Sequence, residues 1–259
     1  MSAPVILRAD DTSVSLGGRS IVERARVKLR RGELAVLVGP NGAGKTTLIR
    51  ALAGLLPADG KISLDDKPLT SFSPRERARR IAYLPQGNVF HWPMPVETVI
   101  ALGRYPHGDP FGTPTDEDRR AVRAALKATG TEGLAKRIVT TLSGGERARV
   151  ALARALATQA PVLLVDEPTV SLDPRHQLVV MEVLRDAARS GCAVLAVLHD
   201  LSLAARFANH VLLMQEGRVV TQGEVKEVLT EQRIADVFGI STHMLDLDGT
   251  RVPIPQWPL

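Results

Sequence analysis

The segment Gly39–Thr46 constrains the fold of this chain more than any other part of the sequence. It follows an apolar run typical of a buried strand, Leu34–Val38, and opens onto a helical pattern. A glycine-rich turn between strand and helix lets backbone N–H groups approach a phosphate, and the helix N-terminus adds a positive dipole end. Lys45 supplies a mobile positive charge and Thr46 a hydroxyl for Mg²⁺, so the segment predicts a nucleoside triphosphate site. We expect the nucleotide to contact Gly39, Pro40, Asn41, Gly42, Ala43, Gly44, Lys45, Thr46 and Thr47.

Two carboxylates end a second buried-type strand. Asp166 and Glu167 follow the aliphatic run Val162–Val165. Alternation of strand and helix patterns along the chain predicts a parallel sheet covered on both faces, and such sheets bind ligands at the carboxyl ends of their strands. We therefore expect Asp166 to hold Mg²⁺, directly or through a water, and Glu167 to polarise a water for attack on the γ-phosphate. An ordinary surface Asp-Glu pair is the less favoured alternative.

The segment Leu142–Glu146 has two interpretations. Ser143 and Glu146 form a capping box, which predicts a well-made helix start and nothing more. However, Gly144 and Gly145 weaken a first helical turn, at a cost of about 1 kcal/mol each, and they suit a backbone that must approach an anion. The chain would then contain two phosphate-binding helix starts but one lysine and one metal-binding strand. A symmetric dimer, in which each Ser143 segment covers the nucleotide of the other copy, resolves this mismatch, and the residues alone leave both interpretations open.

Composition narrows the class of protein. The chain has 259 residues, a formal net charge of +5 and one cysteine, which excludes an internal disulfide. The apolar runs are too short to cross a bilayer, and the first residues do not resemble a secretory signal, so we expect a cytosolic location. Arginine clusters are interleaved with acidic residues and only 3% of the residues are aromatic. We interpret those clusters as solvated helix faces, and we expect no nucleic-acid partner.

Taken together, the motifs resemble the ATP-binding subunit of ABC transporters over roughly residues 5–240. They occur in the order and spacing of that family: Gly39–Thr46, Gln86, Leu142–Glu146, Val162–Glu167, Ser171–Asp173 and His199. The resemblance implies an α/β fold with a RecA-like P-loop core, an antiparallel β subdomain and an inserted helical lobe. We expect the core with its β subdomain at 1–86 and 159–242, the lobe at 87–158 and a C-terminal tail at 243–259. The resemblance also implies two ATP molecules held in a head-to-tail homodimer.

The same resemblance assigns roles to individual residues. It implies that Lys45 contacts the β- and γ-phosphates, that Glu167 is the base, and that His199 holds the γ-phosphate and orients the water. It implies a place at the dimer interface for Asp173, which also reads as a helix cap before Pro174. The implied catalytic residues are Glu167, His199, Lys45 and Gln86. The implied metal-binding residues are Thr46, Gln86 and Asp166, and those that reach the partner's nucleotide are Ser143, Gly144, Gly145 and Asp173.

Two positions depart from the family pattern. The usual aromatic residue that stacks on adenine would fall near Leu16, and leucine cannot stack. We therefore expect weaker discrimination for adenine, by about 1 kcal/mol, with GTP competing better than usual. Glutamate replaces the common glutamine at Glu146, but it still completes the capping box.

Partners follow from the resemblance as well. It implies a separate polytopic membrane permease and a substrate-binding protein, with this subunit at the cytoplasmic face of the (inner) cell membrane and no direct contact with the cargo. We expect the apolar loop Phe90–Pro95 to form part of the groove for the permease's cytoplasmic helix. Ala101–His107 and Leu198–Arg206 resemble importers of iron chelates, haem and cobalamin. A soluble ABC-type ATPase acting on ribosomes or nucleic acid is the main alternative, and a nucleotide-dependent kinase is a weaker one because it gives no reason for Leu142–Glu146.

Overall fold

A six-stranded sheet forms the centre of the protein. The computed structural model describes residues 4–87, 89–108 and 112–259, so Met1–Ala3 of the expected core and Asn88 and Asp109–Phe111 of the expected lobe lie outside the described residues. The sheet order is β10-β9-β3-β8-β7-β6, and all neighbouring pairs are parallel except β9 with β10. The strands are β3 (Leu34–Val38), β6 (Ile81–Leu84), β7 (Val162–Asp166), β8 (Ala193–Val197), β9 (His210–Gln215) and β10 (Arg218–Gly223).

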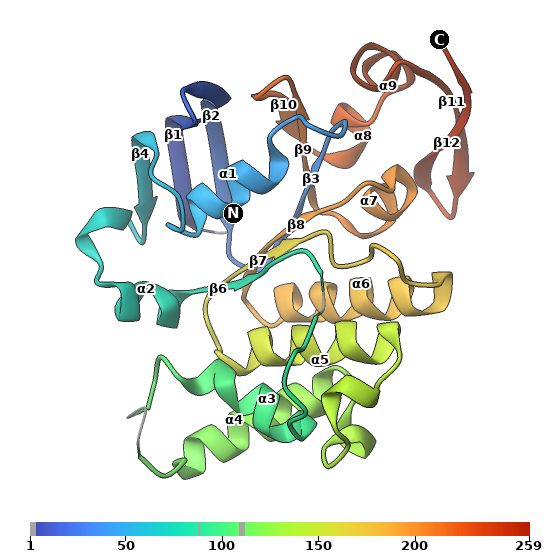
Figure 1. Ribbon diagram of the computed structural model, residues 1–259. Coiled ribbons are helices and arrows are strands. Elements are labelled where there is room, and N and C mark those ends of the chain that lie inside the picture. The colour runs from blue at the N-terminus through green and yellow to red at the C-terminus, as the bar shows by residue number, and fades with distance from the viewer. Residues whose placement is uncertain (1–3, 88, 109–111) are drawn as a thin grey trace.

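Alternating residues of the central strands pack into two different hydrophobic cores. Leu34 and Val36 of β3 face a core shared with α5 (Gly144–Ala157), α6 (Pro174–Arg189) and α7 (Leu201–Phe207). Ala35 and Leu37 face the opposite core, shared with α1 (Lys45–Leu52) and a second, antiparallel sheet. Both faces of a parallel sheet are thus covered, as the near-continuous apolar strands predict. Figure 1 shows α5 and α6 on one side of β6, β7 and β8, and α1 on the other.

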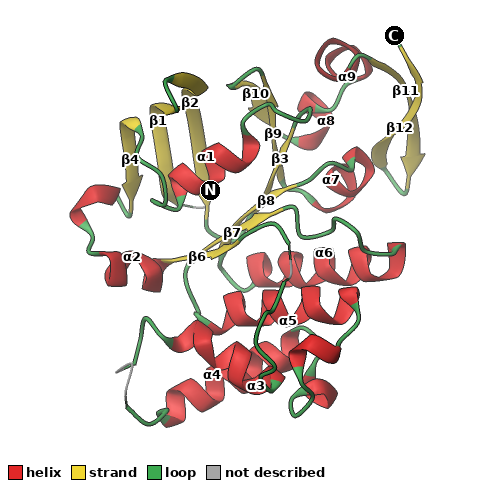
Figure 2. Cartoon of the chain, in the orientation of Figure 1, coloured by secondary structure: helices red, strands yellow, loops and turns green. Residues whose placement is uncertain are grey.

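The antiparallel sheet has the order β2-β1-β4-β5. Its strands are β1 (Val5–Leu16), β2 (Arg19–Arg30), β4 (Asp59–Leu64) and β5 (Lys67–Pro68). β1 and β2 are twelve residues each, because register shifts near Asp11 and Arg24, both at positive φ, let the pairing continue through a bend. Figure 2 shows this sheet beside α1.

The helical region between β6 and β7 has its own core. It contains α3 (Val96–Ala101), α4 (Asp116–Ala128) and α5, which pack Val99, Leu126 and Val150 together. Capping boxes at Thr115 and Ser143 begin α4 and α5, as the sequence predicts for Ser143. The prediction omitted α3, a helix of six residues that follows a proline-rich stretch. Single turns of 3₁₀-helix occur at Leu69–Ser71, Leu102–Arg104, Glu132–Leu134 and Val139–Thr141.

The arginine cluster of α2 (Pro74–Arg80) lies on a helix without buried residues, as expected for a solvated face, but two of its side chains also bind a neighbouring segment. Arg79 donates to the carbonyl of Pro106 at 2.7 Å, and Arg75 donates to the same carbonyl at 2.9 Å and to that of Gly108. These guanidinium groups tie α2 to the segment that follows α3, because a planar fork can reach two carbonyl oxygens at once.

The C-terminal region ends in a hairpin of β11 (Ile240–Leu247) and β12 (Thr250–Pro258), preceded by α8 (Val225–Val228) and α9 (Glu231–Phe238). The hairpin turns at Asp248-Gly249, and it begins three residues before the expected boundary at 243. Pro253, Pro255 and Pro258 are all paired within β12. Prolines suit an edge strand because they offer no N–H to a further strand. Among the described residues, no helix combines the length and apolarity that crossing a membrane requires.

Candidate active site

Strand order brings the predicted catalytic residues to one edge of the central sheet. The strands β3, β8, β7 and β6 are consecutive neighbours, and all four point the same way. Their carboxyl ends lead into Gly39–Thr46, His199, Asp166-Glu167 and Gln86 respectively. Parallel strands place these groups together, although they are up to about 160 residues apart in sequence.

The ammonium group of Lys45 lies inside the glycine-rich loop. Its Nζ donates to the carbonyls of Gly39 and Pro40, both at 2.8 Å. An ammonium group has three donors, so one N–H remains for a phosphate oxygen. Burial lowers the pKa of Lys45, and the charges of Glu167 and Asp166 oppose that shift. The loop therefore holds a cation whose charge is balanced from the neighbouring strand.

Packing explains two of the loop glycines. A Cβ on Gly39 would lie 2.1 Å from the carbonyl oxygen of Met214 in β9. A Cβ on Gly44, which has a φ of 97°, would lie 2.7 Å from the carbonyl oxygen of Ile21 in β2. Gly39 thus serves the contact with β9, while Gly42 and Gly44 adopt a left-handed backbone that glycine permits at little cost. Of the remaining loop residues, Ala43 is buried, Pro40 and Thr47 are half-buried, and Asn41 is exposed.

Thr46 and Asp166 fit a magnesium site. The hydroxyl of Thr46 donates to Asp166 Oδ1 at 3.2 Å, which leaves its lone pairs directed away from the carboxylate. Burial raises the pKa of Asp166, and the hydrogen bond from Thr46 opposes this shift. In the described ranges no group of three or more His, Cys, Asp or Glu side chains could hold a metal alone. Mg²⁺ at nucleotide sites needs only one or two protein oxygens beside the phosphates, so a hydroxyl with a carboxylate suffices.

Glu167 lies between Gln86 and His199. Gln86 Nε2 donates to Glu167 Oε2 at 2.6 Å, and His199 Nε2 lies 2.5 Å from Glu167 Oε1. Glu167 has a φ of 51°, in the left-handed region, which costs a residue with a side chain about 1–2 kcal/mol. Backbone strain of this kind gathers at functional sites, where the surrounding contacts maintain it. The arrangement places one carboxylate, one imidazole and one amide at the end of β7.

The segment around Ser143 lies elsewhere. The hydroxyl of Ser143 accepts from the amide of Glu146 at 3.3 Å, and the amide of Ser143 donates to Glu146 Oε2 at 2.8 Å, which lowers the pKa of Glu146. A Cβ on Gly144 would touch nothing within 4 Å, so packing does not require that glycine. Figure 1 shows the beginning of α5 well apart from the loop between β3 and α1. The structure therefore does not bring Ser143, Gly144 and Gly145 to the phosphate loop of the same chain.

Asp173 contacts His176, and His176 packs against that segment. Asp173 caps α6 by accepting from the amide of His176 at 3.0 Å, and it also accepts from His176 Nδ1 at 2.7 Å. A Cβ on Gly145 would lie 2.6 Å from Cδ2 of His176. The predicted helix cap is confirmed, and Gly145 is needed for the close packing of α5 on α6.

Leu16 ends β1 at the hairpin that leads to β2, where it pairs with Arg19 and is 41% exposed. This hairpin is near the phosphate loop, because Ile21 of β2 contacts Gly44. We expect Leu16→Tyr to strengthen ATP binding about fivefold, the equivalent of about 1 kcal/mol from an added aromatic contact.

Competition between ATP and GTP in equilibrium binding measures this effect. Leu55→Tyr is the matched control, since Leu55 is also exposed but follows the opposite end of α1. Strict ATP preference in the unmodified chain would contradict the interpretation of Leu16.

Comparison with known proteins identifies the family. The family model described as "ABC transporter" matches residues 22–170, which include the glycine-rich loop, Gln86, the Ser143 segment and Asp166-Glu167. The chain belongs to the ABC transporter family. As a member it is an ATPase, and ATP is its nucleotide.

Individual relatives agree with this assignment. The hemin import ATP-binding protein HmuV of Streptomyces coelicolor is 46% identical over 235 residues, covering 90% of this chain and 83% of that protein. The ferric enterobactin transport ATP-binding protein FepC of Escherichia coli is 38% identical over 253 residues, covering 96% and 93%. Among solved structures, a metal-chelate type ABC transporter in an inward-facing conformation matches with a TM-score of 0.84 and 25% identity, covering 98% of both chains. The RecA-like core with its β subdomain is thus the fold of this ATPase.

The sequence did not identify two side chains that contact the site. Tyr83 of β6 and Arg50 of α1 join the hydrogen-bond network of Asp166. Tyr83 looks like an ordinary strand residue, and the contact arises only from the order and register of β6 beside β7.

Proposed function

We propose that this ABC ATPase is the ATP-hydrolysing subunit of an importer for haem, an iron chelate or cobalamin, acting through a separate membrane permease. The observation that carries the catalytic part is Glu167, held by Gln86 and His199 next to the Thr46–Asp166 pair. The names of the relatives support the class of cargo, since HmuV imports hemin and FepC transports ferric enterobactin.

In this proposal each side chain has one task during hydrolysis. Lys45 neutralises charge on the β- and γ-phosphates, and Glu167 accepts a proton from a water that attacks the γ-phosphorus as the bond to ADP breaks. His199 orients the water and the γ-phosphate from the end of β8. Mg²⁺, when bound, neutralises charge on the phosphate oxygens, and Thr46, Asp166 and the free amide oxygen of Gln86 would hold it.

The second half of each nucleotide site comes from another copy of the chain. The Ser143 segment exposes the first amides of α5 and the small residue Gly144, yet it is remote from the phosphate loop of its own chain. A head-to-tail homodimer would bring this helix start over the partner's triphosphate, with Asp173 at the interface. Closure of the dimer on ATP then moves the permease, and hydrolysis releases the closed dimer.

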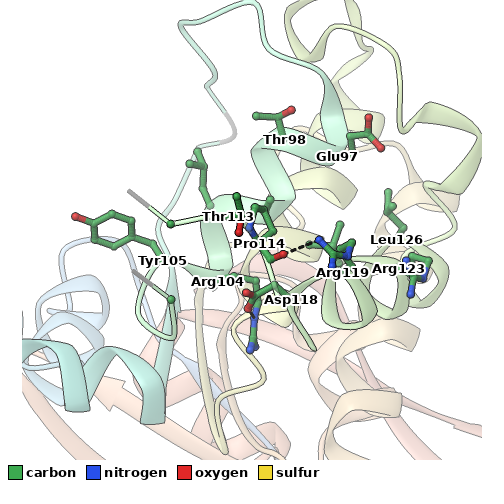
Figure 3. Close-up of a pocket in the computed structure, with 15 residues that line it drawn as sticks. Glu97, Thr98, Arg104, Tyr105, Thr113, Pro114, Asp118, Arg119, Arg123 and Leu126 are labelled. Carbon is green, nitrogen blue, oxygen red and sulfur yellow. Dashed lines mark hydrogen bonds and ion pairs between the residues drawn. The ribbon is translucent and has the colours of Figure 1, made fainter. Parts of the chain in front are cut away.

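The permease is expected to dock on the helical lobe. A cavity of about 600 Å³ lies between α3 and α4. Figure 3 shows its lining, with Leu126 and Arg123 on one side and Tyr105 on the other. Tyr105 and Leu102 are exposed at its rim. Of the apolar loop before α3, Phe90 packs against the core, whereas Trp92 is 72% exposed and available to a partner. We place the cytoplasmic helix of the permease on this side of the lobe, with the subunit bound peripherally to the inner face of the membrane.

Trp92→Ala should weaken permease binding about tenfold or more, because exposed tryptophans are frequent hot spots of interfaces. The ATPase activity of the isolated subunit should not change. Co-purification from detergent-solubilised membranes measures the binding. Trp257→Ala is the matched control, since Trp257 is the other tryptophan and is 73% exposed on the C-terminal hairpin. Equal losses in the two variants would contradict a docking role for Trp92.

Reconstitution tests the proposed function itself. The subunit, its cognate permease and its binding protein are placed in vesicles, and ATP-dependent uptake of haem, cobalamin and ferric chelates is measured. Uptake of one of these cargoes is the expected result. Sedimentation with ribosomes or nucleic acid, with no stable complex with a polytopic protein, would favour the soluble alternative instead.

A further inference from the structure

We propose that Tyr83 is a positioning residue for Asp166, and that together with Arg50 it aims this carboxylate at the metal. The inference rests on the proposed function in one respect, namely that Asp166 serves a magnesium ion. Four side chains form a continuous chain of hydrogen bonds: Arg50, Tyr83, Asp166 and Thr46.

Each link of this chain has a donor and an acceptor. Arg50 Nε donates to the Tyr83 hydroxyl at 3.3 Å, and the Tyr83 hydroxyl donates to Asp166 Oδ2 at 3.3 Å. Thr46 occupies the other oxygen, Oδ1, so both oxygens of Asp166 are engaged. Because a hydroxyl has one proton, the bond from Arg50 directs the Tyr83 proton toward Asp166.

Register explains why these residues meet. Tyr83 of β6 pairs with Leu164 of β7, and Asp166 is two residues further along the same face of β7. That face packs on α1, where Thr46 and Arg50 are one helical turn apart and so share a side. Asp166 is fully buried, at 0% exposure, so its orientation depends on protein groups rather than on solvent.

The position of Tyr83 also links the proposed metal-binding residue, Asp166, to the proposed base, Glu167. Tyr83 is three residues before Gln86, which donates to Glu167. The end of β6 therefore contacts two successive carboxylates, Asp166 through Tyr83 and Glu167 through Gln86. A displacement of the end of β6 would disturb both carboxylates, whereas removal of the Tyr83 hydroxyl alone should disturb only Asp166.

Tyr83→Phe tests the proposal because it removes one oxygen and keeps the ring. Partners of metal-binding groups typically contribute tenfold or more to metal affinity, so the Mg²⁺ concentration that gives half-maximal binding of a fluorescent ATP analogue should rise about tenfold. Affinity for the same analogue without Mg²⁺ should not change, and thermal denaturation checks that the variant is folded. Tyr105→Phe is the matched control, as Tyr105 is the chain's other tyrosine and is 64% exposed.

Arg50→Gln should produce a similar but smaller shift, and in the Tyr83→Phe background it should add less than it does alone, because the two residues act through one chain. Thr46→Ala distinguishes failure of the positioning role of Tyr83 from failure of the magnesium assignment. If Thr46→Ala changes the Mg²⁺ dependence and Tyr83→Phe does not, the positioning role is overturned and the metal site stands. If neither changes it, the magnesium assignment fails as well. An equal loss of affinity with and without Mg²⁺ would also overturn the proposal, since it would make Tyr83 a support of the nucleotide loop.

Discussion

Glu167→Gln is expected to reduce ATP turnover about 10²–10⁴-fold, the range that a general base contributes, while ATP binding persists. The amide keeps the shape of the side chain and can still contact Gln86 or His199, but it cannot accept a proton from water. Because hydrolysis would normally release the closed dimer, the variant should also accumulate a nucleotide-dependent dimer. Single-turnover hydrolysis and size-exclusion chromatography in the presence of ATP measure the two effects.

Glu76→Gln provides the matched control for this change. Glu76 caps α2 through Ser73 and contacts no residue of the site, so the same substitution there should leave turnover near the unmodified value. A Glu167→Gln variant that hydrolyses ATP at full rate would refute the assignment of the base. A variant that no longer binds ATP would show instead that the change had damaged the site.

Ser143→Arg should block dimer closure while sparing ATP binding by the monomer. The substitution places a large cation at the exposed start of α5, where the proposed dimer requires close contact with the partner's nucleotide loop and its lysine. Like charges brought together at an interface cost several kcal/mol, so we expect dimerisation to weaken at least 100-fold, equivalent to about 3 kcal/mol. The Glu167→Gln background, which should trap the dimer, makes the loss directly visible by sedimentation.

Ser73→Arg controls for loss of a helix cap. Ser73 forms the same capping box at the start of α2 as Ser143 forms at the start of α5, but α2 has no place in the proposed interface. The control should dimerise normally. Unimpaired ATP-dependent dimerisation of Ser143→Arg would argue against the action of this segment across an interface.

The sequence predicted those parts of the protein whose structure is set by local chemistry. The glycine-rich loop, the capping box at Ser143 and the carboxylates at the end of β7 each depend on a few adjacent residues, and the structure brings the loop, Gln86, Asp166, Glu167 and His199 to one edge of the sheet. The resemblance to the family predicted that these motifs act together at one nucleotide site.

Features that depend on tertiary contacts could not be predicted in this way. The helix α3 has six residues and is stabilised by burial of Val96, Val99 and Ile100 rather than by propensity. β12 accepts several prolines because it is the edge of a two-stranded hairpin, and that pairing is a tertiary feature. Tyr83 was missed because its role follows from the register of β6 against β7.

In the proposed dimer two copies of the chain complete each nucleotide site, so hydrolysis requires pairing. The most direct test is the ATPase rate per subunit, measured in the isolated protein over a wide range of protein concentration at saturating ATP and Mg²⁺. This rate should rise with concentration as the dimer forms and fall toward zero on dilution. A rate per subunit that stays at its full value when the protein is too dilute to pair would contradict the requirement for pairing.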